Sequence, residues 1–157
     1  MSVKPIPDGY HTLTPYLICQ GAGQAIEFYK QAFGAKEVMR MNGPGDSIAH
    51  AEIQIGDSRI MLGDEMPSMG YRSPKGLDGC PVGLCLYVEN CDAVFDRAVK
   101  AGAIVKRPLD NQFYGDRSGQ VIDPFGHVWT IGTHVEDVSE EEMCRRMEAM
   151  MAEQGQG

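Results

Sequence analysis

The same order of apolar and polar positions occurs twice along this chain of 157 residues. In each copy a short alternating run, typical of a half-buried strand, leads into apolar positions at helical spacing, at 23–33 and at 92–101. A glycine follows each helical stretch, as Gly34 and as Gly102, where helices often end in the left-handed conformation. These glycines are 102 − 34 = 68 residues apart, and a repeat at such a long period indicates an internal duplication.

The pattern predicts the elements of each copy. Strands are expected at 14–19, 37–41, 48–55 and 59–62 in the first copy, and at 82–88, 104–107, 119–123 and 128–131 in the second. The predicted organisation is an irregular lead-in at 1–9, a first module at 10–62, a linker or lid at 63–81, a second module at 82–133, and a C-terminal helix and tail at 134–157. The last helix should begin at the capping box Ser139–Glu142, and it carries methionines at helical spacing.

The composition narrows the classes of partner. The formal net charge is −8 at pH 7, and nucleic-acid binding depends on Lys and Arg meeting phosphates, so we expect no nucleic-acid partner. No apolar run approaches the length of a membrane span, so we expect no membrane partner. No charged, apolar leader opens the sequence, so secretion is not expected. The five cysteines lack CxxC spacing and are expected to be reduced thiols, which predicts a cytoplasmic protein.

Four short motifs follow one another along the duplicated pattern. They are Ala25–Tyr29, Phe33–Ala35, Ala51–Asp57 and Asp123–His127. In this order and spacing they resemble the vicinal oxygen chelate superfamily, which includes glyoxalase I, bleomycin- and fosfomycin-resistance proteins, and extradiol dioxygenases. Gln112–Arg117 is further similar to a subgroup of uncharacterised glyoxalase-like proteins. The resemblance spans residues 10–135 and implies an α+β fold, in which two βαβββ modules form a curved mixed sheet around a cavity.

In such a fold one face of each strand packs under a helix and the other lines the cavity. In the strand at 48–55, alternation assigns Ile48, His50, Glu52 and Gln54 to the cavity, and Ala49, Ala51, Ile53 and Ile55 to the helix. The side chains expected to contact a small, partly apolar ligand are Tyr16, His50, Glu52, Gln54, Arg59, Met61, Tyr87, Tyr114 and Arg117. Arg117 suits a carboxylate or phosphate, and a structural ion pair between Asp116 and Arg117 is the alternative.

The resemblance also implies a divalent metal held by His and Glu side chains from the first and fourth strands of each module. The matching positions here are Thr14, Met61, Gly83 and Thr130, with 83 − 14 = 69 and 130 − 61 = 69. Glycine has no ligating side chain, a methionine thioether is too soft for Mg, Mn or Fe(II), and neutral threonine is a poor ligand. We therefore expect no metal at these positions and no cofactor.

A relocated metal site remains open, because His50 and Glu52 share the cavity side and His11 in the adjoining segment is within reach. The alternative for His50 and Glu52 is a hydrogen-bonded pair with Arg59 or Arg117. His127 and Asp123 are expected to serve the turn that follows the seventh strand, with His127 in turn or surface structure.

Two functions follow from these observations. The preferred one is a metal-free protein that binds a small molecule, similar to bleomycin-resistance proteins. The alternative is a glyoxalase-, dioxygenase- or isomerase-like enzyme with His50 and Glu52 as catalytic groups, so the sequence leaves open whether any reaction is catalysed. Relatives usually complete their clefts across a two-fold axis, so we expect a homodimer, with the methionine-rich last helix as a contact.

Overall fold

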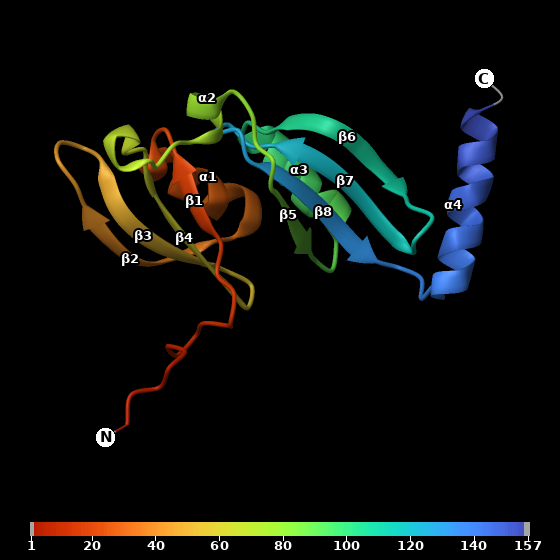
Figure 1. The fold of residues 1–157 in the computed structure, drawn as a ribbon, viewed down its shortest axis with the longest axis horizontal. Helices are drawn as coiled ribbons and strands as arrows, with labels where there is room; N and C mark the ends of the chain where they lie inside the picture. Colours follow the sequence, from red (N-terminus) through yellow and green to blue (C-terminus); the bar gives the residue numbers. More distant parts are fainter. Residues whose placement is uncertain (1, 156–157) are drawn as a thin grey trace.

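The computed structural model describes residues 2–155, and Figure 1 shows two modules of the same design side by side. The first contains β1 (Tyr16–Cys19), α1 (Ala22–Phe33), β2 (Lys36–Asn42), β3 (Ile48–Ile55) and β4 (Ser58–Asp64). The second contains β5 (Gly83–Tyr87), α3 (Cys91–Ala101), β6 (Ile104–Asn111), β7 (Asp116–Ile122) and β8 (Val128–His134). The segment between them carries a 3₁₀ turn, η1 (Pro67–Met69), and α2 (Pro74–Leu77), and α4 (Glu140–Gln154) follows the second module.

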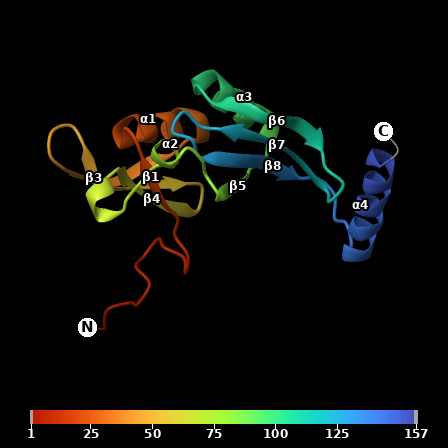
Figure 2. The same ribbon diagram turned by 45° about the horizontal axis from the view of Figure 1, so that its top comes forward.

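Each module has its own four-stranded sheet. The strand orders are β1-β4-β3-β2 and β5-β8-β7-β6, with the β1–β4 and β5–β8 pairs parallel and all other pairs antiparallel. The α+β fold of two βαβββ modules is therefore confirmed, and the predicted mixed sheet is divided into two hydrogen-bonded sheets. The helices α1 and α3 pack against each other and cover the same side of the sheets (Figure 2).

The buried core lies between these helices and the sheets. Tyr29, Ile26 and Phe33 of α1 meet Trp129 and Ile131 of β8, and all five side chains are at most 8% exposed. The Phe33 and Trp129 rings have centroids 4.7 Å apart. This apolar burial across the module boundary joins the two halves into one folded unit.

A buried carboxylate strengthens the same boundary. Asp123 Oδ2 accepts hydrogen bonds from the Tyr29 hydroxyl at 2.6 Å and from Trp129 Nε1 at 2.9 Å. Asp123 Oδ1 accepts from the backbone N–H groups of Phe125 and His127, at 2.9 and 3.0 Å. Asp123 thus stabilises the turn that follows it, as predicted. It also joins the second module to α1 of the first module, and the sequence did not indicate this contact.

His127 follows that turn but is not on the surface. Its side chain is buried, with Nε2 3.1 Å from the backbone oxygen of Ile18 and 3.9 Å from Cys19 Sγ. Of the expected turn or surface structure, the turn is confirmed, since the His127 N–H donates to Asp123 Oδ1, and the surface position is wrong, because the side chain contacts Ile18 and Cys19 of β1. His127 is therefore a structural link between the modules.

The duplication extends to the helix caps. Asp64 Oδ1 accepts hydrogen bonds from the backbone N–H groups of Gly21 and Ala22 at the start of α1, at 2.9 and 2.8 Å. Thr133 Oγ1 accepts from the Cys91 N–H at the start of α3, at 3.0 Å. These two capping residues are 133 − 64 = 69 residues apart. Each first helical turn is therefore satisfied by a side chain from the last strand of its own module.

A β-bulge changes one predicted set of faces. Met41 pairs with His50 and Asn42 pairs with Ile48, so Ala49 is an extra residue in β3. Ile48 is consequently 2% exposed on the helix side, whereas Ala49 is exposed. The strict alternation predicted for Ile48 and Ala49 is wrong, because a bulge shifts the faces by one residue. His50 keeps its predicted face.

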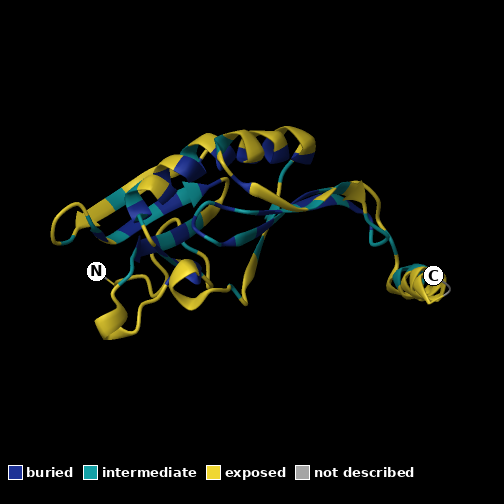
Figure 3. Cartoon of the chain, turned by 90° about the horizontal axis from the view of Figure 1, so that it is seen from above, coloured by how far each residue is buried: buried dark blue, intermediate teal, exposed yellow. Residues whose placement is uncertain are grey.

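The C-terminal helix α4 stands apart from both modules, and none of its residues is buried (Figures 1 and 3). Ser139 caps it as predicted, since Ser139 Oγ accepts from the Glu142 N–H at 3.2 Å. Arg146 holds the helix near the second module through Glu136 at 2.9 Å and the Phe113 carbonyl at 3.1 Å. No helix within residues 2–155 has the length and apolar character needed to span a membrane.

Candidate functional site

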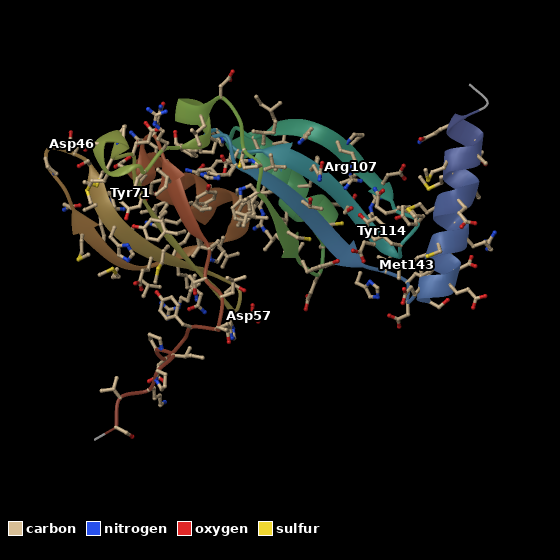
Figure 4. All side chains as sticks on the ribbon, viewed as in Figure 1. Asp46, Asp57, Tyr71, Arg107, Tyr114 and Met143 are labelled. Atoms are coloured by element: carbon tan, nitrogen blue, oxygen red, sulfur yellow. The ribbon has the colours of Figure 1, made fainter. Side chains whose placement is uncertain are left out.

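The side of the first sheet opposite α1 carries six of the nine predicted ligand-contacting residues. We call this surface the first-sheet face, and its members are Tyr16, His50, Glu52, Gln54, Arg59 and Met61. Strand register brings them together, because Met61 of β4 pairs with Tyr16 on one side and with Glu52 on the other, while Arg59 pairs with Gln54. Figure 4 shows Tyr71, from the segment between the modules, beside the same sheet.

A hydrogen-bonded chain crosses this face. The Tyr16 hydroxyl lies 2.9 Å from His50 Nδ1, and His50 Nε2 lies 3.3 Å from Glu52 Oε1. An ionised carboxylate only accepts, so in a neutral His50 the Nε2–H donates to Glu52 and Nδ1 accepts from Tyr16. This arrangement fixes the imidazole tautomer and leaves the Tyr16 oxygen at one end of the hydrogen-bonded chain.

Nearby groups set the charge states at the Glu52 end of the chain. The Tyr10 hydroxyl lowers the pKa of the Glu52 carboxyl, and His50 and Arg59 act in the same direction against the effect of burial. No hydrogen bond of good geometry joins Tyr10 to Glu52, however, because the Tyr10 oxygen has no partner within bonding geometry among residues 2–155. Burial and the Glu52 charge raise the pKa of Tyr10 to about 12. Glu52 is therefore a carboxylate and Tyr10 a neutral phenol near neutral pH.

A cleft of about 570 Å³ opens at the end of this face, between the two modules. Its wall includes Thr14 and Arg59 from the first module and Cys85, Tyr87 and Trp129 from the second. This volume lies within the range of small-molecule sites. The mixture of aromatic, aliphatic and charged groups suits a small organic molecule with a few polar atoms.

A smaller pocket of about 260 Å³ lies at the other end of β1. Tyr16 and Ala49 line it together with Met66 and Tyr71 from the segment between the modules. Residues of the predicted linker or lid therefore form part of a pocket wall beside the first-sheet face.

Tyr87 belongs to a second polar cluster, on the other sheet. Its hydroxyl donates to Asp116 Oδ2 at 2.6 Å, and Asp116 Oδ1 lies 2.8 Å from His134 Nδ1. His134 Nε2 lies 2.8 Å from Asp137 Oδ1. The two carboxylates raise the pKa of His134, with Asp137 contributing most.

Arg117 does not lie in either cluster. Its guanidinium pairs with Asp92 at the start of α3, through Nε and Nη2 at 2.8 Å each. The predicted ion pair between Asp116 and Arg117 is wrong, because neighbouring residues of β7 point to opposite faces of the sheet. Arg117 faces α3, and the ligand contact and the pairing with His50 and Glu52 expected of it have no support in this geometry.

Tyr114 lies over the second sheet, close to Arg107 (Figure 4). Its hydroxyl is 3.3 Å from Ser118 Oγ, which Arg107 Nη2 approaches at 3.2 Å. The predicted ligand-contacting set is therefore divided: six residues share the first-sheet face, Tyr87 and Tyr114 lie on the second sheet, and Arg117 faces a helix.

The positions that the family resemblance assigns to a metal do not fit a divalent ion. Met61 is level with Tyr16 across the β1–β4 pair, and Thr130 is level with Cys85 across the β5–β8 pair. A thioether, a phenol and a hydroxyl offer a hard cation little in exchange for its hydration shell. Of the two other positions, Thr14 offers only a neutral hydroxyl and Gly83 has no side chain.

The relocated metal site is not assembled either. His11 Nε2 approaches the backbone oxygen of Asp57 at 3.2 Å. In the described part of the chain, no three His, Cys, Asp or Glu side chains gather as a metal site requires. The predicted grouping of His11 with His50 and Glu52 is therefore wrong, because the lead-in runs along the β3–β4 turn. His50 and Glu52 pair with each other, as the alternative expected, but among residues 2–155 neither forms the expected hydrogen bond with Arg59 or Arg117.

Sequence reasoning missed two residues of these clusters. The sequence pattern places Tyr10 at the start of the first module and gives it no role, although the Arg59 guanidinium lies over its ring, with Cζ 5.3 Å from the ring centroid. His134 was assigned to the tail, although β8 extends to include it. Alternation beyond Thr130 and Gly132 was the available signal for His134, whereas no local pattern places Tyr10.

Comparisons with known proteins agree with this architecture. A family model described as the Glyoxalase/Bleomycin resistance protein/Dioxygenase superfamily matches residues 11–131. The chain is 43% identical over 148 residues to the uncharacterised protein Mb0911c of Mycobacterium bovis, covering 92% of this chain and 95% of that protein. It is 30% identical over 143 residues to protein YjdN of Escherichia coli, covering 76% and 92%.

Solved structures share the fold. Protein PA1353 from Pseudomonas aeruginosa matches with a TM-score of 0.65 and 24% identity, over 80% of this chain and 99% of that one. The fosfomycin resistance protein FosX from Listeria monocytogenes matches with a TM-score of 0.62 and 17% identity, over 85% and 97%. At these identities the likeness concerns architecture alone, so function must be argued from the site.

Proposed function

Because the chain belongs to the Glyoxalase/Bleomycin resistance protein/Dioxygenase superfamily, we propose that it binds a small molecule on the first-sheet face without a metal ion. The observation that supports this most is the chain from Tyr16 through His50 to Glu52, which lies on the sheet surface near a cleft of about 570 Å³. Among these face residues Arg59 also lines the cleft, and the face offers a ligand aromatic surface together with oriented donors and acceptors.

The side chains at the family metal positions support the metal-free part of the proposal. Thr14, Met61 and Thr130 supply no carboxylate or imidazole, and Gly83 supplies no side chain. A ligand would then be held by direct contacts with the wall instead of by coordination. All five cysteines are free thiols, which supports a reducing compartment such as the cytoplasm as the place of action.

A thermal-shift screen of small organic molecules, run on protein stripped with EDTA, tests this function. Ligands that bind the native state raise the melting temperature, because they stabilise it by RT ln(1 + [L]/Kd). We expect hits whose stabilisation falls in His50→Ala and survives in His134→Ala, a matched histidine change on the second sheet. Hits that appear only after Ni²⁺, Zn²⁺ or Mn²⁺ is added would contradict the proposal.

A second candidate function is an acid–base enzyme. The order Tyr16–His50–Glu52 favours it. Glu52 orients the His50 imidazole, which can accept the Tyr16 proton while the Tyr16 oxygen takes a proton from a substrate. Incubating a screened carbonyl compound with the protein in D₂O would test this by NMR. Exchange of a C–H proton that is lost in Glu52→Gln, while binding is retained, would establish catalysis over binding alone.

A further inference from the structure

Arg59 has donors that nothing in the folded chain satisfies. Within residues 2–155, its Nε and Nη1 atoms are buried and have no hydrogen-bond partner, and the hydroxyl of Tyr10 is in the same condition. Buried donors are nearly always paired in native proteins, because leaving one unpaired costs about 1–3 kcal/mol. Three unpaired polar atoms side by side therefore call for a partner that is not part of the chain.

The guanidinium of Arg59 also lacks a close ion-pair partner in the described part of the chain. In the described part of the chain no carboxylate lies within 4.0 Å of its guanidinium, and the nearby Glu52 pairs instead with His50. The Tyr10 ring stacks on the guanidinium, with Cζ 5.3 Å from the ring centroid, and this stabilises the cation without satisfying its N–H groups. A guanidinium in this condition is complementary to an anion with planar oxygen atoms.

A short stretch of the lead-in covers these nitrogen atoms. We call Gly9 and Tyr10 the strap. Gly9 has φ +84°, a conformation that favours glycine, and a Cβ atom built at this position would lie 2.7 Å from Arg59 Nη2, so the strap passes close to the guanidinium. Beyond the strap, Arg59 borders the cleft between the modules. Arg59 therefore lies between the strap and the cleft.

We propose that Arg59 and the Tyr10 hydroxyl anchor the carboxylate of a small organic acid that occupies the cleft. This inference rests on the proposed binding function and specifies its ligand class. A carboxylate supplies two coplanar oxygen acceptors and one negative charge, which matches one guanidinium and one phenol donor. A phosphate dianion would bring a second charge close to the Glu52 carboxylate, so the structure favours the monoanion.

Protein-detected NMR titration of the full chain with benzoate, benzamide and inorganic phosphate tests the proposal. Benzamide has the size of benzoate without its charge, and phosphate has charge without the apolar ring. We expect benzoate to shift the amide signals of the strap and of β4, and to bind more tightly than the other two. Arg59→Met should weaken benzoate binding by at least about tenfold, or about 1.4 kcal/mol, because it removes one partner of a close charge pair.

Arg97→Met is the matched control, because Arg97 is exposed on α3 and lies outside the cleft. Its affinity for benzoate should equal that of the wild type. Tyr10→Phe keeps the ring over Arg59 and removes only the hydroxyl, so it should weaken benzoate several-fold, and it decides the matter if Arg59→Met does not fold.

Equal benzoate affinity in wild type and in these variants would overturn the proposal, as would tighter binding of phosphate or benzamide. Neutral molecules that bind the first-sheet face while benzoate does not would refute the anion site alone and leave the proposed function in place. Failure of every screened compound to bind that face would refute both.

Discussion

Tyr29 and Asp123 come from different modules, and their buried hydrogen bond is 2.6 Å long. Removing the hydroxyl with Tyr29→Phe leaves the buried carboxylate one donor short, which should lower the free energy of unfolding by about 1–3 kcal/mol. Urea unfolding of this variant beside Tyr71→Phe, whose side chain is exposed, measures the difference. Equal losses in the two variants would show that the bond contributes nothing across the module boundary.

The stabilisation that His134 contributes should depend on pH. Both of its ring nitrogens lie 2.8 Å from carboxylate oxygens, so both must carry protons when the two bonds form, and its pKa is raised above 6.5. A raised pKa in the folded state means that the stabilisation is complete below pH 6.5 and is lost as the pH rises through the folded-state pKa. NMR titration should report that higher pKa.

The same titration of the Asp137→Asn variant tests the cause of the shift. Because Asp137 contributes most to the shift, the variant should bring the His134 pKa back toward 6.5. A pKa that stays in place in the variant would show that Asp116 alone holds the imidazolium.

The sequence could predict which strand residues lie on the first-sheet face. Side chains alternate regularly through Tyr16 in β1 and from His50 to Gln54 in β3. It could not predict the side of Arg117, since the strand was expected to start at 119 whereas β7 starts at Asp116. The contact between Tyr10 and Arg59 depends on how an irregular segment crosses a sheet, which leaves no periodic signal.

The side chains that cap the two module helices should contribute to the stability of the fold. Asp64 accepts three backbone hydrogen bonds, from Gly21 and Ala22 in the first turn region of α1 and from Ile48 in β3. Asp64→Ala should therefore lower the free energy of unfolding by about 1–3 kcal/mol, and Thr133→Val, the equivalent change in the second module, by less because a hydroxyl is uncharged.

Chemical denaturation followed by circular dichroism gives both values. Asp46→Ala is the control, because Asp46 is exposed in the β2–β3 turn (Figure 4). A cost for Asp64→Ala no larger than that of the control would mean that the caps do not stabilise α1.

Helical periodicity and the glycines at Gly34 and Gly102 allowed both module helices to be predicted, and these glycines do end the helices in the structure. The bulge at Ala49 was not predictable, because it depends on the pairing of β2 with β3 and not on the sequence of β3 alone. The helix α2 was not expected, since four residues are too few to show a period.

For the whole molecule the homodimer remains a prediction. Helix α4 buries none of its residues, and the Met147, Met150 and Met151 side chains are 43–64% exposed. Methionine packs adaptably against a partner surface, so we expect light scattering to give 2 × 17.2 = 34.4 kDa. Asp substitutions at Met147 and Met151 should shift the mass toward 17.2 kDa, whereas Glu148→Asp on the same helix should not. A mass of 17.2 kDa for the wild type at every concentration would refute the dimer.

The architecture could be predicted because the duplication shows two equal modules and the motifs within them resemble a family of known fold. It could not show that the sheets would be separate, nor that α4 would extend away from them. Both features depend on how modules and helices meet in space, and the periodicity within a single strand or helix carries no information about that.

The most direct test of metal-independent binding on the first-sheet face is a calorimetric titration with the best ligand from the screen. The titration is performed on protein stripped with EDTA and repeated with equimolar Ni²⁺, Zn²⁺ or Mn²⁺. The account predicts the same dissociation constant in every case, and a loss of binding in His50→Ala regardless of metal. Binding that is absent from the stripped protein and restored by one of these ions would contradict it.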